Sequence, residues 1–271
     1  DRPDVRRLTL GVLGLVFASH GTTDGQAYRR DILPVVEALR SLATARGLPF
    51  APACVSARVR EGLRAQKIKA PGVRETVAQL TGEGAGRVLV MPSHLVGGST
   101  YQALEDEAAA LGVPAAVSVS GPLLSTRSGA RELARAVLEE HPARRRCKLL
   151  LVAHGVAGCP NDPYVWLREA AAECGRADVM VVTLGDDPRA VAARLASKGA
   201  TRVTLVPLML CAGHHARLQV ASQTPSSWAG ALVAQGLVVD VVREGLGSIR
   251  AVRDCYVKRA QAALDGAAPS L

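Results

Sequence analysis

"GATRVTLVPLMLCAGHHA", residues 199–216, decides the fold because the chain contains a second copy of the pattern. It aligns without a gap to "GAGRVLVMPSHLVGGSTY", residues 84–101. In each copy an Arg-Val pair opens an apolar run, a proline follows the arginine after five residues, and a glycine follows the proline after six. Self-similarity of this kind predicts two structurally similar halves.

A second pair of segments repeats in the same order. "LVFASHG", which ends at Gly21, and "LLLVAHG", which ends at Gly155, are both apolar runs that lead into His-Gly. Ordered repetition of two separate blocks is hard to produce by chance. We therefore expect two similar domains, residues 1–145 and residues 146–271.

Short apolar runs rich in β-type residues alternate with helical patterns, which predicts βα units and parallel sheets. The predicted strands are residues 12–19, 49–56, 87–92, 114–120, 148–153, 178–184, 202–208 and 237–243. Amphipathic segments at 27–45, 126–140, 188–198 and 248–264 predict helices between them. The predicted fold class is α/β, with two Rossmann-like domains, each a four-stranded parallel sheet flanked by helices.

The composition is that of a soluble globular protein, with 48% hydrophobic and 21% charged residues in 271. The net charge of +9 is compatible with an anionic partner, such as nucleic acid, a phosphate or a polycarboxylate, but does not decide among them. Aromatic residues make up only 3%, which argues against a stacking platform for nucleic acid, and no apolar run approaches the ~20 residues of a membrane span. We expect a small anionic ligand, no nucleic acid and no membrane.

Six cysteines are scattered without a CxxC motif, which argues against a zinc ribbon or a redox dithiol. Reduced thiols and a cytoplasmic location are the expectation. A periplasmic location stays open, because the sequence does not begin with methionine. Phosphate-binding loops of the GxxxxGK[ST] or GxGxxG type after a strand, and the HExxH metal motif, are absent from the sequence.

Several polar residues follow the predicted strands, where an open α/β sheet binds its ligands. His20 and His154 each follow a strand, and Thr100 takes the place in the first repeat that His215 takes in the second. The carboxyl ends of parallel strands meet at one edge of a sheet. These four residues are predicted to line a cleft between the two sheet edges.

A neutral imidazole binds borderline divalent metals and acts as a base near neutral pH. His154 and His215 stand on neighbouring loops, next to Gly155 and close to Gly213. They are predicted to bind one metal ion, leaving coordination positions that a substrate could complete. The alternative is that they are ordinary hydrogen-bonded loop residues, and for His20 alone the two interpretations are nearly balanced.

Neighbouring residues allow two interpretations each. His214 is expected to face solvent or support its neighbour, and Cys211 either adds a thiolate or simply packs. Cys159 allows the same two interpretations. His94 aligns with Met209, which favours a structural or interface role.

Two further positions carry titratable groups near helix ends. Asp186 and Asp187 either reach the sheet edge or cap the helix that begins at Pro188. His141 stands at a predicted helix end, where a positive side chain suits the helix dipole.

Four stretches, "VFASHGTT", "HLVGGSTYQALEDE", "LLLVAHGVAG" and "VTLVPLMLCAGHHARL", resemble the anaerobic cobalt chelatases, or sirohydrochlorin cobaltochelatases, of the class II chelatase and ferrochelatase-like superfamily. The late "SSWAGALVAQG…REGLG" is similar to the family's C-terminal segment, so the resemblance covers nearly the whole chain. It implies two similar α/β domains and insertion of a divalent metal into a polycarboxylated tetrapyrrole without ATP.

The resemblance places the metal-binding, catalytic histidines on His154 and His215, and His20 resembles the His-Gly histidine of short relatives. The metal is a substrate, with Co2+ favoured and Ni2+ or Fe2+ open, and the tetrapyrrole is sirohydrochlorin or a related compound of cobalamin or tetrapyrrole biosynthesis. The resemblance leaves a homo-oligomer open.

The chain departs from the family pattern at two positions where acidic residues are common, Thr100 and Thr183. These departures favour an alternative function, a non-catalytic homologue that binds and carries metal or tetrapyrrole. Retention of both histidines favours the enzyme. A nucleic-acid binder is the weakest of the three hypotheses.

Overall fold

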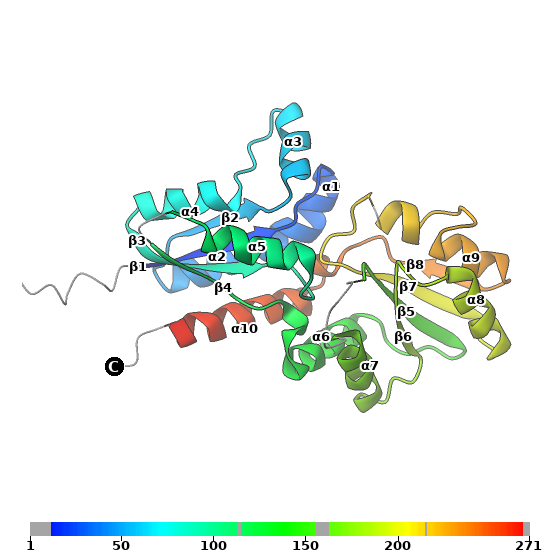
Figure 1. Ribbon diagram of the computed structural model, residues 1–271. Coiled ribbons are helices and arrows are strands. Elements are labelled where there is room, and N and C mark those ends of the chain that lie inside the picture. Colours follow the sequence, from blue (N-terminus) through cyan, green and yellow to red (C-terminus); the bar gives the residue numbers. More distant parts are fainter. Residues whose placement is uncertain (1–11, 113–114, 156–162, 215, 268–271) are drawn as a thin grey trace, which may run out of the picture. The chain divides into compact units, whose positions relative to one another are not determined.

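The computed structural model describes residues 12–112, 115–155, 163–214 and 216–267. Two four-stranded parallel sheets have the orders β2-β1-β3-β4 and β6-β5-β7-β8. The strands are β1 (Val12–Ser19), β2 (Phe50–Cys54), β3 (Ala85–Pro92), β4 (Ala116–Val119), β5 (Cys147–Ala153), β6 (Val179–Thr183), β7 (Arg202–Leu208) and β8 (Val238–Val241). All eight predicted strands and the predicted α/β fold class are confirmed (Figure 1).

The chain forms two compact units that do not follow chain order. One comprises residues Asp1–Thr23, Val35–Pro122 and Tyr256–Leu271, and the other comprises Asp24–Pro34 and Leu123–Cys255. In the sequence, the first sheet ends with β4 at Val119 and the second begins with β5 at Cys147. Each unit nevertheless takes in a segment from the distant end of the chain, Tyr256–Leu271 in the first and Asp24–Pro34 in the second.

In the first unit, alternation along β1 supplies both faces of the sheet. Val16 and Ala18 join a buried cluster with α4 (Val73–Gly82). Phe17 points the other way and meets the Tyr256 ring of α10 edge-on, at 6.0 Å between ring centroids. The remaining long helices of this unit are α2 (Leu33–Ala45), α3 (Ala57–Ala65), α5 (Ser99–Ala109) and most of α10 (Arg250–Ala267).

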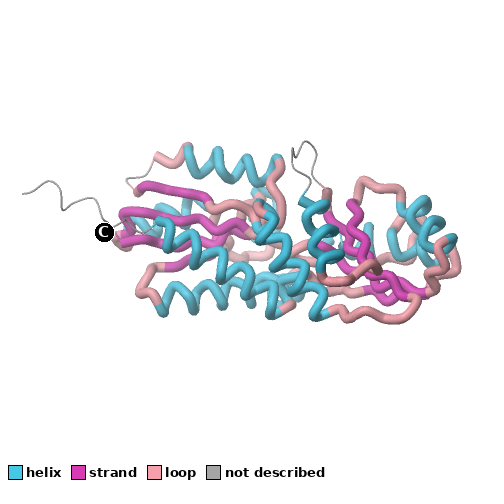
Figure 2. Tube along the Cα trace, turned by 90° about the horizontal axis from the view of Figure 1, so that it is seen from below, coloured by secondary structure: helices cyan, strands magenta, loops and turns pink. Residues whose placement is uncertain are grey.

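The second unit repeats this alternation on β5. Leu150 and Val152 join a buried cluster with α8 (Pro188–Ser197) and α9 (Trp228–Ala234), which contributes the 2% exposed Trp228. Helices α6 (Arg127–Glu140) and α7 (Pro163–Glu173) pack along each other and cover the opposite face (Figure 1). Within each unit the strands run side by side and the helices lie outside them (Figure 2).

The predicted helix at 27–45 begins differently from expectation. It opens with a single turn, α1 (Gly25–Ala27), and a π-helical turn, η2 (Tyr28–Ile32), before α2 begins. A second π-helical turn, η4 (Ala216–Val220), follows β7, and two 3₁₀ turns are η3 (Leu123–Ser125) and η5 (Leu246–Ser248). In the part of the chain that the structure describes, no helix has both the length and the hydropathy to span a membrane.

Candidate metal-binding site

The carboxyl edge of the second sheet presents the first predicted ligand. β5 and β7 are neighbours, and their last residues, Ala153 and Leu208, lie opposite each other. His154 follows β5 directly and is exposed. The loop of residues 209–213 follows β7 from the same edge, so both histidine-bearing segments leave the sheet side by side. His215 itself lies outside the described residues.

The backbone conformation explains why each of the two histidines is followed by glycine. Gly155 has φ +89°, and its counterpart Gly21 has φ +87°, the left-handed region that glycine adopts without steric cost. A Cβ on Gly155 would also lie only 3.3 Å from the Cβ of Thr183. The turn therefore requires glycine, and the histidine before it is released from the strand into solvent.

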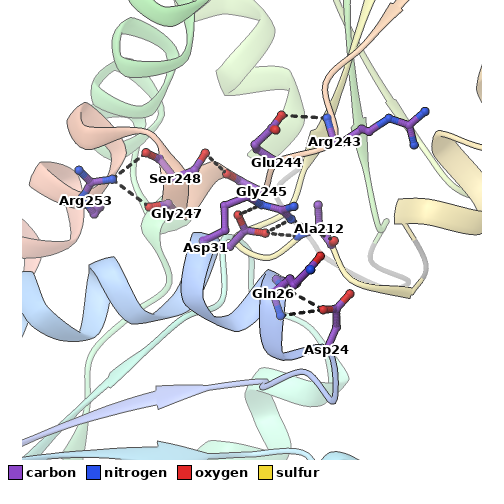
Figure 3. Close-up of polar contacts among 12 residues, drawn as sticks. Asp24, Gln26, Asp31, Ala212, Arg243, Glu244, Gly245, Gly247, Ser248 and Arg253 are labelled. Carbon is purple, nitrogen blue, oxygen red and sulfur yellow. Dashed lines mark hydrogen bonds and ion pairs between the residues drawn. The ribbon is translucent and has the colours of Figure 1, made fainter.

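A buried carboxylate anchors the loop that leads to His215. Asp31, in η2, is fully buried and accepts a hydrogen bond from the Ala212 backbone N–H at 2.9 Å (Figure 3). The guanidinium of Arg30 donates to both Asp31 oxygens, from Nε at 2.7 Å and from Nη2 at 2.8 Å. A buried charge with this many partners is well compensated, so the loop is tied to a rigid point.

The other side of the same loop is held by η5. Leu246 and Gly247 donate backbone hydrogen bonds to the carbonyls of Met209 and Leu210 at 2.9 and 3.0 Å. A Cβ on Gly247 would lie 1.8 Å from the Asp31 carbonyl oxygen, so η5 and η2 are in direct backbone contact there. Two separate segments thus fix residues 209–212 before the histidines.

The structure favours packing for Cys211. Burial, and after it the negative charge of Asp31, raises the pKa of this thiol to about 12. A thiol with that pKa is protonated at neutral pH and is a poor metal ligand. His214 is exposed, as predicted.

The end of β6 carries a carboxylate that the sequence interpretation did not assign. Asp186 Oδ2 accepts hydrogen bonds from the Thr183 backbone N–H at 2.7 Å and from its hydroxyl at 3.0 Å. Asp187 instead caps α8 and accepts from the Arg189 N–H at 2.9 Å. The two aspartates therefore divide the two roles that the sequence left open. Thr183 therefore holds an acidic side chain at the end of β6.

The carboxyl edge of the first sheet is built differently. His20 is exposed, and its backbone N–H donates to Ser93 Oγ at 3.1 Å, while Thr100 is exposed in the first turn of α5. His94 packs edge-on against Tyr101, and among the described residues neither of its ring nitrogens has a hydrogen-bond partner. Burial, with a smaller effect of His20, lowers the pKa of His94 to about 4. This favours the structural interpretation of His94.

One expectation at a helix end is wrong. His141 directly follows α6 as its C-cap, but burial lowers its pKa, which disfavours the positive charge expected of it. Arg176 supplies the cation instead, and its guanidinium donates to the His141 carbonyl at 2.9 Å. The fixed charge of arginine serves the helix end without the cost of protonating a buried ring.

Among the described residues, no three histidine, cysteine, aspartate or glutamate side chains are grouped closely enough to hold a metal ion. In the described residues, His154 follows β5 directly, and Asp186 is hydrogen-bonded to Thr183 at the end of the adjacent strand β6.

Comparison with known proteins identifies the family. The cobalt chelatase (CbiK) family model matches residues 14–265. The chain belongs to this family. Among its relatives are the sirohydrochlorin cobaltochelatase of Salmonella typhimurium, 27% identical over 70% of this chain and 74% of that protein, and sirohydrochlorin cobaltochelatase CbiKC of Nitratidesulfovibrio vulgaris, 28% identical over 80% and 79%. The predicted family and the prediction of a metal chelatase are confirmed.

Solved structures support the fold of this family member. SirB from Bacillus subtilis, solved with Fe3+, has a TM-score of 0.65 at 13% identity and covers 94% of this chain and 98% of its own. CbiX, described as the terminal enzyme of siroheme biosynthesis in denitrifying bacteria, has a TM-score of 0.53 at 16% identity over 92% and 99%. The chain spans 55% of DR2241 from Deinococcus radiodurans, a multi-domain protein similar to chelatases, with a TM-score of 0.61 at 20% identity.

Proposed function

We propose that this chelatase inserts Co2+, in preference to Ni2+ or Fe2+, into sirohydrochlorin or a closely related polycarboxylated tetrapyrrole, without ATP and in the cytoplasm. The family and the names of the two curated relatives support the reaction. One structural observation supports placing the reaction at this site. His154 follows β5, the loop before His215 follows the neighbouring strand β7 and is bound to Asp31, and both leave the sheet at the same edge.

In this proposal, His154 and His215 bind the incoming metal through neutral imidazole nitrogens. Two protein ligands leave coordination positions open for the pyrrole nitrogens, which replace the histidines as the metal enters the ring. Insertion of a divalent ion releases two protons from the two pyrrole N–H groups, so charge is conserved. The metal is a substrate that leaves with the product.

The two protons need acceptors close to the ring. Asp186 is exposed, and of its carboxylate oxygens Oδ2 is the one that binds Thr183. We assign proton acceptance to Asp186 together with the histidines as they are released from the metal. A catalytic role for His20 as a further proton acceptor is part of the same proposal, because the first sheet presents it on an equivalent His-Gly turn.

The test is an anaerobic absorbance assay with purified protein, sirohydrochlorin and Co2+. The proposal expects conversion to cobalt-sirohydrochlorin faster than the uncatalysed reaction, in the absence of ATP. A carrier would change the absorbance of sirohydrochlorin on binding without accelerating insertion. That outcome would support the alternative function of a carrier. Threonine in place of an acidic residue at Thr100 and Thr183 favours a carrier, whereas the carboxylate of Asp186 beside Thr183 favours the enzyme.

A further inference from the structure

A cavity of about 120 Å³ lies in the second unit beside the histidine-bearing loop. Ala212 and Ala216, which flank His214 and His215 in the chain, both line it. The full lining consists of Asp24, Gln26, Arg30, Pro207, Ala212, Ala216, Arg217, Ala221, Val242 and Arg243. A ligand held there is placed directly next to the proposed metal-binding segment.

The lining combines two kinds of surface. Small apolar residues, namely Pro207, three alanines and Val242, provide contacts for methylene groups. Three arginines, Arg30, Arg217 and Arg243, provide positive charge against the single carboxylate of Asp24. This combination matches an alkyl carboxylate, whose chain is apolar and whose end is a planar anion that arginine binds with two parallel hydrogen bonds. A phosphate ion has no methylene group for the apolar part.

Most of the charges already have partners. Asp24 caps α1 by accepting from the N–H groups of Gln26 and Ala27, and it pairs with Arg217 at 2.7 Å. Arg30 is occupied by Asp31. For Arg243 the described residues show only a backbone contact, from its N–H to Glu244 at 3.0 Å (Figure 3). Among the described residues, the guanidinium of Arg243 therefore has no hydrogen-bond or ion-pair partner.

The backbone around the cavity is itself unusual. Arg30 belongs to the π-helical turn η2, and Ala216 and Arg217 belong to η4, the other π-helical turn among the described residues. π-helical turns are rare and are frequently found at functional sites. Both turns contribute residues to the same cavity, which is an independent reason to regard the cavity as a functional site.

We propose that this cavity binds one alkyl carboxylate side chain of the tetrapyrrole, with Arg243 as its main carboxylate-binding residue and Arg217 as the second. The inference rests on the proposed function. A volume of about 120 Å³ is close to that of cavities that hold one small molecule such as benzene (~150 Å³), so it can take a short acid side chain. The cavity thus orients the ring by one arm beside the histidine loop.

The test is Arg243→Gln in steady-state cobalt insertion. Loss of one charge-assisted hydrogen-bonded contact is expected to raise KM for sirohydrochlorin about 10-fold or more. KM for Co2+ is expected to change less than about twofold, because Arg243 does not act on the metal. Arg243→Lys keeps the charge but loses the planar fork, and it is expected to recover only part of the affinity.

The matched control is Arg144→Gln, which removes one positive charge from the same unit. Arg144 is an exposed arginine that lines a different cavity together with Cys147, the first residue of β5, so it lies at the amino edge of the sheet. A KM for sirohydrochlorin that changes equally in both variants would assign the effect to net charge and overturn the subsite. An unchanged KM in Arg243→Gln would also overturn it.

Binding measured without metal separates this inference from the proposed function. A wild-type protein that inserts cobalt, with an Arg243→Gln variant that binds metal-free sirohydrochlorin equally well, rejects the subsite alone. A wild-type protein that binds sirohydrochlorin through Arg243 but does not accelerate insertion rejects the catalytic function and retains the subsite. Absence of sirohydrochlorin binding in the wild type rejects both.

Discussion

The two units share a sheet order and a His-Gly turn, yet they differ in the loop that follows the third strand of each sheet. After β3 the chain passes through His94, which is packed against Tyr101, and soon enters α5. After β7 it forms a loop bound to Asp31 on one side and to η5 on the other. The two units therefore share their strand order and their His-Gly turn, and they differ in the loops after β3 and β7.

The anchor of the second loop comes from far away in the sequence. Asp31 and Ala212 are 181 residues apart, and Asp31 belongs to the segment Asp24–Pro34 that joins the second unit. No such buried carboxylate holds the corresponding loop among the described residues of the first unit, whose buried polar residues there are serines. The two sheets thus have the same strand order, but among the described residues only the loop after β7 is bound to a buried carboxylate.

The largest expected effect separates the histidines of the two units. His154→Ala removes a proposed metal ligand and is expected to lower the rate of cobalt insertion by at least about 100-fold, more than loss of a supporting contact would. His20→Ala removes a proposed proton acceptor and is expected to lower the rate less than about 10-fold. Both rates are measured by absorbance with sirohydrochlorin and Co2+. Equal losses in the two variants would contradict the asymmetry between the units.

The next effect tests the anchor itself. Asp31→Asn weakens both the Arg30 pair and the acceptor for Ala212, so the loop before His215 is less well fixed. KM for Co2+ is expected to rise by about 10-fold or more, as for other residues that orient metal ligands. The visible absorption of bound Co2+ is expected to change as well, and a purely structural role would leave that spectrum unaltered.

Asp178→Asn is the matched control for the anchor. Asp178 forms a pair of 2.8 Å contacts with Arg176, and both side chains are less than a fifth exposed. The pair lies at the start of β6, at the opposite edge of the same sheet. This variant is expected to lose stability, by up to about 3–5 kcal/mol if the pair is broken completely, while KM for Co2+ stays unchanged. An equal rise in KM in both variants would reduce the Asp31 effect to general destabilisation.

Sequence patterns predicted the scaffold because its causes are local. Apolar runs mark the strands, and the repeated His-Gly requires glycine for a left-handed turn. The same reasoning placed His154 at a sheet edge and left Asp186 and Asp187 open. It could not separate these two, because both residues are of the type that caps helices. Their roles depend on which group donates a hydrogen bond to each carboxylate: Thr183 donates to Asp186, and the Arg189 N–H of α8 donates to Asp187.

The anchor and the cavity were beyond prediction from the sequence. The pairing of Asp31 with Ala212 depends on tertiary structure, and π-helical turns have no simple hydrophobic period. One signal was present. Asp31 stands four residues from both Ala27 and Val35, so it falls on the buried face of that helical segment. A carboxylate on an apolar face needs a partner, which marks it as worth attention.

A moderate effect is expected from the carboxylate at the end of β6. Asp186→Asn removes a proposed proton acceptor and is expected to lower kcat for insertion by about 10-fold. Asp187→Asn is the control, because asparagine caps a helix about as well as aspartate and is expected to leave kcat within about twofold. A kcat that falls equally in both variants would deny Asp186 a catalytic role.

The smallest effect concerns the buried histidine of the first unit. The pKa of His94 is about 4 in the folded protein, whereas an unfolded histidine has a pKa of about 6.5. Between these values the unfolded chain binds a proton that the folded protein excludes, so the free energy of unfolding falls as the pH falls. From pH 7.5 to pH 5.5 the loss is expected to be about 1 kcal/mol, measured by urea denaturation.

His94→Leu isolates this contribution, because it fills a similar space without a titratable group. The difference between the pH profiles of the two proteins cancels the groups that they share, including His20 and the neighbouring Tyr101–Glu105 contact. The variant is expected to lose the His94 part of the acid sensitivity. Parallel profiles would mean that His94 accepts a proton in the folded state, as an accessible histidine would. The loop after β3 would then carry a second basic imidazole near His20. In that case the loop after β3 would not be purely structural, and its contrast with the loop after β7 would fail.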